Sequence, residues 1–423
     1  MTTRLTHTTV SLLVALISIA PLTHAQSLAN RIASASDRSV QFSFKARPGV
    51  CGDGRSYYST APGNLNGTFN SSSADECMAG PVRVVVDLAD RNVVAMRTFV
   101  GASTVPDAGV RDLGTVAPAD AADYLLTVAA RADGRVGRDA ISAALLGDSV
   151  DLTNRLLDIA RDQARPLETR RAAISGLRID SRQADRVATA LLQIATNENE
   201  VQGVRSHALS VLSRLDHSGG IQSLIKLANG NPSSWIARES MRVLASSGDP
   251  RARQFLRTTA QRTDLPDEVQ AVAIRGLGRN YVTGQDANLL RSLYPRLTGD
   301  RSRDAVLASI SELGGTENLQ WLMEIVRDEK LPEQSRRRAL ESVARAGATA
   351  SSLVALYDPT TDPQLRSSLI NIYSRLSDKA ATDKLVWIAR NEQNQQLRRR
   401  AVTALSRNSD PAVRQVLQDI VER

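Results

Sequence analysis

The chain contains few cysteines, few aromatic residues and few lysines. Cysteine occurs twice in 423 residues, and aromatic side chains make up 4% of the chain. Two sulfurs with no histidine nearby do not make a zinc site. Too few aromatic side chains lie among the basic residues to stack on nucleic acid bases. No segment after the first 25 residues is long and apolar enough to cross a membrane.

The chain also lacks the short motifs of common enzyme classes. It has no Gly-x-Ser-x-Gly, no His-Glu-x-x-His, no P-loop and no glycine-rich dinucleotide turn. Beyond residue 25 the only histidines are His207 and His217, which lie ten residues apart. We therefore expect no catalytic site, no metal and no cofactor. A Ser-His-Asp site can still assemble from distant segments, so the missing motifs do not prove the point.

Residues 1–25 have the pattern of a secretory signal peptide. Arg4 supplies a positive charge, Val10–Leu22 an apolar run, and Thr23-His24-Ala25 a small-residue cleavage site. The alternative is an uncleaved membrane anchor, for which the thirteen-residue run is short. We expect an exported bacterial protein, periplasmic or secreted, with no transmembrane segment after cleavage.

The two cysteines, Cys51 and Cys77, lie in the part that would be exported. Disulfides persist outside the cytoplasm, so we predict that they pair. The alternative is a reactive or metal-binding thiol. The Gly52-Asp53-Gly54 turn could suggest a calcium loop, but it lacks the further carboxylates that such a loop needs.

Residues 26–117 have the pattern of a small β-rich module. Val40, Phe42 and Phe44 alternate with polar residues, as in a half-buried strand. Residues 81–101 read as a β-hairpin with a longer loop around Asp90-Arg91-Asn92. A small sheet needs a partner to pack on, and helices beginning near Pro118 are the natural candidate.

One eight-residue pattern recurs through the rest of the chain. A residue that is usually arginine is followed three on by a small or apolar residue, and four and seven on by aliphatic residues. The copies begin at Arg170, Arg205, Ala237, Gln270, Arg303, Arg336, Arg366 and Arg398, 30 to 35 residues apart, with a fainter one at Gly137. These positions share one face of a helix, and self-similarity at this period indicates stacked repeats.

A second amphipathic segment precedes the pattern in most repeats, so each repeat is a helix pair. The turn between the two helices often carries proline and then an acidic residue, as at Pro166-x-Glu168 and Pro266-Asp267. In these features residues 118–423 resemble the HEAT-repeat family, in its short bacterial form. The resemblance implies a mainly α fold, an α-α superhelix of about nine repeats, in which the last segment, 412–421, caps the stack. One group of such repeats is named for attaching bilin chromophores, but no residues here carry that activity over.

The formal net charge is +8, and nearly all of the positive charge is arginine. The first arginine of each copy begins the stripe that faces the core, and we expect its head to pair with a carboxylate in a turn. The arginines that follow it should point away from the core. In HEAT-like solenoids the second helix lines the concave surface, which would place a basic stripe there. Its predicted members are Arg171, Arg337, Arg338, Arg399 and Arg400. The plainer interpretation is a solvated helix face with local ion pairs.

Solenoids of this kind usually bind other macromolecules. We therefore predict a non-catalytic scaffold that holds a protein partner in the cell envelope, plausibly through an acidic segment of it. Export argues against nucleic acid as the partner. One alternative is an enzyme or enzyme subunit whose site lies in the N-terminal module, with the repeats selecting the substrate. Its candidate residues are Asp53, Arg55, Tyr57, Tyr58, Asp75 and Glu76. A purely structural spacer is the third possibility.

Overall fold

The computed structural model describes residues 27–54, 57–59, 77–101, 109–132, 134–177, 183–215, 219–231, 234–279, 284–407, 413–415 and 417–418. The chain divides into two compact units, Met1–Val150 and Asp151–Arg423. The predicted signal peptide and half of the predicted cap lie outside the described residues. None of the described helices has the length and apolar content that crossing a bilayer requires.

The first unit contains a four-stranded sheet in the order β5-β4-β1-β6. Strands β1 (Ser39–Phe44), β4 (Val82–Ala89) and β5 (Asn92–Val100) are antiparallel, and β6 (Arg111–Thr115) runs parallel to β1. The predicted hairpin over 81–101 is confirmed. Its turn is shorter than predicted, because Asp90 and Arg91 both adopt positive φ, 48° and 62°, and close it with two residues.

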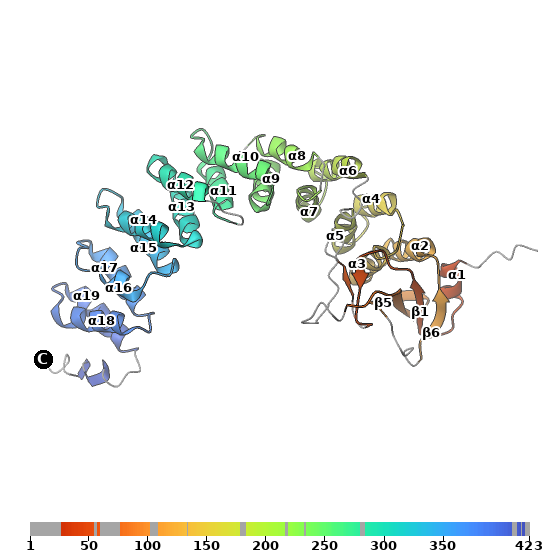
Figure 1. Cartoon of the computed structure of the whole chain (residues 1–423), viewed down its shortest axis with the longest axis horizontal. Coiled ribbons are helices and arrows are strands. Elements are labelled where there is room, and N and C mark those ends of the chain that lie inside the picture. Colours follow the sequence, from red (N-terminus) through yellow and green to blue (C-terminus); the bar gives the residue numbers. More distant parts are fainter. Residues whose placement is uncertain are drawn as a thin grey trace, which may run out of the picture. The chain divides into compact units, whose positions relative to one another are not determined.

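The sheet packs on helices of its own unit: α1 (Leu28–Ala33), α2 (Pro118–Ala129) and α3 (Gly134–Ala144) (Figure 1). Phe42 is fully buried, and its ring meets the ring of Tyr124 edge to face at 5.9 Å. The expected partner of the sheet is therefore the observed one. Because α2 and α3 lie in the sheet's unit, the compact units divide at 150/151 rather than at the predicted 117/118 boundary.

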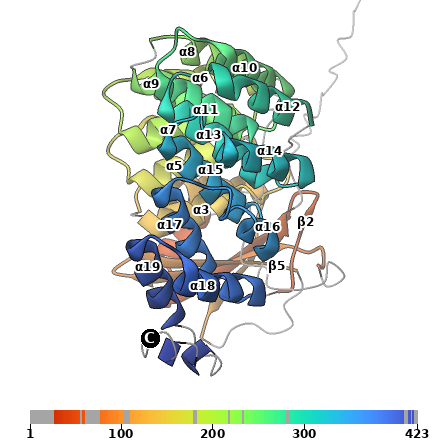
Figure 2. The same cartoon turned by 90° about the vertical axis from the view of Figure 1, so that its left-hand side faces the viewer.

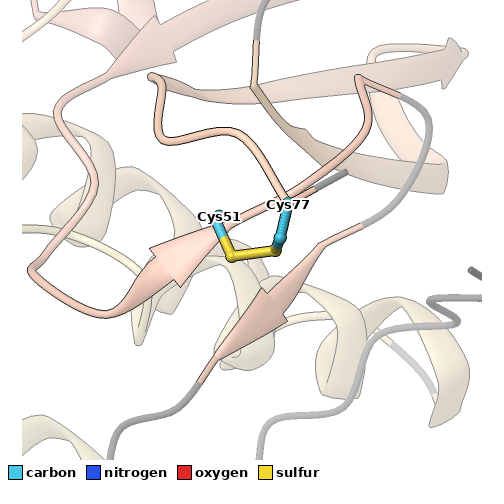
Figure 3. The surroundings of a disulfide bond; sticks show 2 residues. All are labelled: Cys51 and Cys77. Carbon is cyan, nitrogen blue, oxygen red and sulfur yellow. A yellow bond between two sulfur atoms is a disulfide. The ribbon is translucent and has the colours of Figure 1, made fainter. Parts of the chain in front are cut away.

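The predicted disulfide is present. Cys51 ends β2 (Val50–Cys51), which pairs with β3 (Tyr58–Ser59), and its sulfur is bonded to that of Cys77, with a Cα–Cα distance of 5.3 Å (Figure 3). Next to it, Gly52 and Met78 exchange two backbone hydrogen bonds of 2.9 Å each. The disulfide and these two hydrogen bonds together tie the end of β2 to the segment that leads into β4.

The second unit is a row of helix pairs, as the repeat pattern predicted. The pairs are α4 (Thr153–Arg161) with α5 (Leu167–Gly176), α6 (Ala184–Thr196) with α7 (Gln202–Leu212), α8 (Gly220–Ala228) with α9 (Trp235–Ser246), α10 (Pro250–Gln261) with α11 (Asp267–Leu277), α12 (Gly284–Leu293) with α13 (Asp300–Leu313), α14 (Thr316–Arg327) with α15 (Glu333–Arg345), α16 (Ala350–Val354) with α17 (Pro363–Tyr373), and α18 (Lys379–Asn391) with α19 (Gln395–Leu405). A short 3-10 helix, η3 (Tyr294–Arg296), follows α12. The eight clear copies of the pattern lie on the second helix of each pair, and the faint copy lies on α3.

Second helices stack directly on one another in sequence, from α5 and α7 to α17 and α19. Figure 2 separates the two rows, with α13, α15 and α17 on one side and α12, α14 and α16 on the other. Small residues allow the close approach. A Cβ on Gly276 would lie 2.7 Å from the Cβ of Ala245, and a Cβ on Gly278 would lie 2.3 Å from that of Ser309.

The first arginine of the pattern links its own repeat to the next one. Arg170 is 2% exposed; its Nε donates to the carbonyl of Ala160 at 3.0 Å, and its Nη1 donates to Glu200 at 2.8 Å. Ala160 ends the first helix of the same repeat, whereas Glu200 lies in the turn of the following repeat. The expected pairing with a turn carboxylate is thus confirmed for Arg170, and the carboxylate comes from the neighbour, whereas Arg205 and Arg398 donate to backbone carbonyls.

The same link recurs nearer the C-terminus. Arg336 pairs with Asp362 at 2.9 Å, and Arg366 pairs with Glu392 at 3.1 Å. Where the pattern has glutamine, Gln270 keeps the intra-repeat part of the link and donates to the carbonyl of Ala260 at 3.0 Å. We call the three arginine–carboxylate pairs, Arg170–Glu200, Arg336–Asp362 and Arg366–Glu392, the arginine ladder.

The acidic residues in the turns also serve the neighbouring repeat. Pro266 is the N-cap of α11, in the turn between the two helices as predicted, and Pro166 and Pro332 take the same place before α5 and α15. Asp267 in the first turn of α11 accepts the backbone N–H groups of Arg301 and Ser302 at 2.9 Å each. It therefore caps the N-terminus of α13 in the next repeat.

Candidate binding surface on the second helices

The surface available for binding on the second helices follows from the repeat pattern. If the first residue of each copy is position 0, positions 3, 4 and 7 share its face, and positions 2, 5 and 9 point the opposite way at 100° per residue. In the second unit, α7, α9, α11, α13 and α15 follow the inner side of the curve in Figure 1. We call positions 2, 5 and 9 of the second helices the second-helix face.

Three of the five predicted arginines are held by nearby carboxylates. Arg171 pairs with Glu168 at 3.4 Å, Arg337 with Glu333 at 4.0 Å, and Arg338 with Asp304 of the preceding second helix. All six side chains are at least one-third exposed, so each of these pairs contributes only about 0–1 kcal/mol to stability. At these three positions the structure therefore has the local ion pairs expected for a solvated helix face, the plainer of the two interpretations.

The other two predicted arginines, Arg399 and Arg400 on α19, are exposed and make no ion pair among the described residues. Arg400 occupies position 2 of the second-helix face, and Arg399, at position 1, lies beside it. Position 9 carries Arg345 on α15, Arg375 after α17 and Arg407 after α19, and all three are exposed. Among the earlier described repeats, position 9 is also an exposed arginine after α7 (Arg214) and after α11 (Arg279). The sequence analysis missed this row, although its constant offset from the repeat pattern was a signal that could have revealed it.

On α5 and α7 the same face also carries a neutral hydrogen-bonded pair. Ser175 on α5 and His207 on α7 lie on it, with Oγ 2.8 Å from Nε2. Burial, with Arg171 as a second cause, lowers the pKa of His207, so the ring is neutral at pH 7 and can share this hydrogen bond. The pair joins two adjacent second helices. His217, the other histidine noted in the sequence, lies outside the described residues.

A polar groove of about 540 Å³ lies where α7 and α9 end. Arg214, Arg242 and Ser246 line it. Arg242 is paired with Glu239, and this hydrogen bond raises the pKa of the guanidinium and lowers that of the carboxyl. Arg251, which also lines the groove, is paired with Asp249 at 2.8 Å. The groove therefore offers hydroxyls and Arg214, whose side chain donates to Ser210 at 3.1 Å.

The alternative site in the N-terminal module is only partly described. Arg55, Asp75 and Glu76 lie outside the described residues, as do the side-chain surroundings of Tyr58. Burial and the nearby Asp139 raise the pKa of Tyr57. The large groove of the first unit, about 1250 Å³, lies elsewhere, between α1, the β4–β5 turn and α2. Neither Asp53 nor Tyr57 lines it.

The chain matches a repeat-family model over part of its length, but the solved structures that it is similar to are only distantly so. The family model for HEAT repeats matches residues 188–278, which run from α6 to the end of α11. No curated protein matches the chain. Among solved structures, human deoxyhypusine hydroxylase in complex with glycerol is 18% identical, with 57% of this chain and 97% of that chain covered and a TM-score of 0.28.

Two further solved structures are similarly distant. The complex of CpcE and CpcF of phycocyanin lyase from Nostoc sp. PCC7120 is 15% identical, with 56% of this chain and 93% of that chain covered and a TM-score of 0.29. A microtubule polymerase with TOG domain arrays is 10% identical, with coverage of 72% and 96% and a TM-score of 0.25. These likenesses carry no statement about activity or partners. The repeat pattern, the stacked helix pairs and the family match give one conclusion: the chain is a HEAT-like repeat protein.

Proposed function

We propose that this protein is an exported, non-catalytic scaffold that binds an envelope protein along its second-helix face. The observation that carries the proposal is the row of exposed arginines on α15, α17 and α19, which no carboxylate among the described residues neutralises. A solenoid presents a long surface on a regular frame, and such surfaces are used for binding macromolecules. The Cys51–Cys77 disulfide supports an oxidising location outside the cytoplasm.

Site-specific photo-crosslinking tests the proposal. A photoreactive amino acid replaces Asn371 or Thr403, both exposed on the second-helix face of α17 and α19. The matched control positions are Gln320 and Glu324, exposed on the first helix α14. Protein with the sequence 26–423 is incubated with native envelope extract and irradiated. We expect one specific protein to be crosslinked from the second-helix positions and not from α14. Crosslinking from α14 alone, or from neither helix, would contradict the proposal.

The enzyme alternative is tested in the same preparation. Substituting Asp53 and Tyr57 with Asn and Phe should leave the crosslinking unchanged if the N-terminal module has no part in binding. A hydrolase or transferase activity in the purified protein that disappears in this variant would favour the alternative instead.

A further inference from the structure

The row of arginines at position 9 occupies the same backbone position in successive repeats. Arg345 is the last residue of α15, and Arg375 and Arg407 follow the ends of α17 and α19 by two residues. The backbone N–H of Arg375 donates to Ile372 at 3.0 Å, and that of Arg407 donates to Ala404 at 3.4 Å. Both residues extend the last helical turn alike. We call these three residues the arginine row.

The heads of the arginine row have no acidic partner among the described residues. Arg345 donates only to the carbonyl of Glu341 at 3.4 Å and to the hydroxyl of Ser342 at 3.1 Å. This contrasts with the ladder, whose arginines are at most one-quarter exposed and face carboxylates. Residues 333–407 contain thirteen Lys and Arg against seven Asp and Glu, a net charge of +6 out of +8 for the whole chain. The positive charge of the protein is therefore concentrated around this row.

The helix dipole alone does not account for the row. A cation near a helix C-terminus gains about 0.3–1 kcal/mol from the dipole, which would favour arginine in every repeat. Position 9 is arginine after α7 and α11 as well (Arg214 and Arg279), but it is Ser246 on α9 and an exposed glutamate, Glu312, on α13. The uninterrupted run of arginines in successive repeats thus begins after α13, and the Glu312 carboxylate would repel an acidic ligand that extended further. On the second-helix face of α15, Glu341 at position 5 is the acidic residue nearest in sequence to the arginine row.

The spacing of the row points to an extended ligand. Helices α15, α17 and α19 are direct neighbours in the stack, and packed helices lie about 8–10 Å apart. A polyproline-II segment has three residues per turn and rises about 3.1 Å per residue, so every third side chain lies on one side at intervals of about 9 Å. Guanidinium groups bind carboxylates through two parallel hydrogen bonds, which rewards such a match in spacing.

We infer that α15, α17 and α19 bind an extended acidic segment of the partner protein. Glutamate or aspartate at every third residue of that segment meets Arg345, Arg375 and Arg407 in turn. Arg399 and Arg400 add positive charge at the α19 side. The inference rests on the proposed scaffold function and names the ligand of its binding face.

The spacing is tested with two synthetic peptides of identical composition. One has three glutamates at every third position in a background of proline and alanine, and the other has the three glutamates in succession. Binding to protein with the sequence 26–423 is measured by fluorescence anisotropy at low salt. We expect the spaced peptide to bind at least about fivefold more tightly, and its affinity to fall as salt is added. Equal affinity for the two peptides would overturn the spacing argument.

The location is tested with two matched triple variants. The first is Arg345→Gln with Arg375→Gln and Arg407→Gln. The control is Arg214→Gln with Arg275→Gln and Arg279→Gln, which removes the same charge from exposed positions on α11 and just after α7 and α11. Arg214 and Arg279 occupy position 9 of their repeats, outside the uninterrupted run. Exposed ion pairs contribute about 0.2–1 kcal/mol each, so we expect the first variant to bind the spaced peptide about tenfold more weakly. The control should change the affinity less than about twofold. Equal loss in both variants would mean non-specific charge attraction and would overturn the location.

The outcome separates this inference from the proposed function. A partner crosslinked from Asn371 or Thr403 by a protein that binds neither peptide would leave the scaffold function in place and reject the acidic ligand. Circular dichroism of the variants confirms folding, which these exposed substitutions should not disturb.

Discussion

The arginine ladder predicts a large coupling between Arg170 and Glu200. Their side chains are 2% and 3% exposed, so removing either partner leaves a buried charge without its counter-charge. Arg170→Gln and Glu200→Gln should each lower the free energy of unfolding by about 3–5 kcal/mol. The double variant should lose less than either single variant, about 1–2 kcal/mol, because both buried charges are gone. Gln270 shows how glutamine fits the ladder position, since its amide reaches the carbonyls of Ala260 and Arg262.

Urea unfolding followed by far-UV circular dichroism measures the free energy of unfolding of the wild type, the two single variants and the double variant. Repeats do not always unfold together, so hydrogen exchange over α5 and α7 is followed in parallel. The matched control is Arg171→Gln, which removes the exposed neighbour and should cost less than about 1 kcal/mol. Additive losses in the double variant, or single losses below about 0.5 kcal/mol, would refute the buried-pair argument.

The same pair sets the acid response. Burial pushes the pKa of Glu200 up, but hydrogen bonds from Arg170 and from the backbone of Val201 outweigh it and hold the pKa below its ordinary value of 4.5. The folded state therefore resists protonation more than the unfolded state. The pair's stabilisation is full above pH 4.5 and is lost as the pH falls through the lowered pKa. Glu200→Gln should remove this part of the pH dependence.

Three further predictions concern other parts of the chain. Gly278→Ala should destabilise the protein, because its Cβ would clash with the next helix, whereas Gly203→Ala on α7, with 3.6 Å of clearance, should be neutral or stabilising by up to about 1 kcal/mol; urea unfolding compares the two. Replacing Cys51 and Cys77 together with Ala should lower the stability of the first unit by about 3 kcal/mol, and a thermal melt in which the loss is absent would contradict it. His207→Gln should flatten the pH dependence of unfolding below pH 6.5: the lowered histidine pKa makes the wild type lose stability as the pH falls below 6.5, and a histidine NMR titration at an ordinary pKa would reject this.

The repeats could be predicted from the sequence because each copy must bury the same stripe. Ala339 and Leu340 are fully buried on α15, as Ala173 and Ile174 are on α5, and this periodicity survives without any knowledge of the neighbours. The disulfide and the hairpin were equally local inferences. Strand β6 escaped prediction, because Arg111–Thr115 contains one apolar residue and a glycine and has no alternation. It is a strand through its pairing with β1, which lies far away in sequence.

The interactions on the second-helix face were predicted less well than the fold. Charge and helix position placed Arg171, Arg337 and Arg338 away from the core, and their side chains are at least one-third exposed, but these signals could not reveal carboxylates brought in by packing. Asp304 reaches Arg338 only because α13 lies beside α15. The cap that Asp267 supplies to α13 is likewise a product of stacking. Interactions between repeats thus depend on the arrangement in space, whereas those within a repeat can be read from the sequence.

The arginine ladder should also make the two ends of the stack differ in their resistance to a pulling force. Each arginine reaches forward to the following repeat, while each carboxylate already accepts a backbone N–H of its own turn: Val201 for Glu200, Gln364 for Asp362 and Asn394 for Glu392. Peeling repeats away from the N-terminal side would leave a carboxylate that is still hydrogen-bonded and can be protonated. Peeling from the C-terminal side would strip an arginine of its counter-charge, and arginine cannot release its proton. The stack should therefore resist unfolding that starts from its C-terminal side more strongly than unfolding that starts from its N-terminal side.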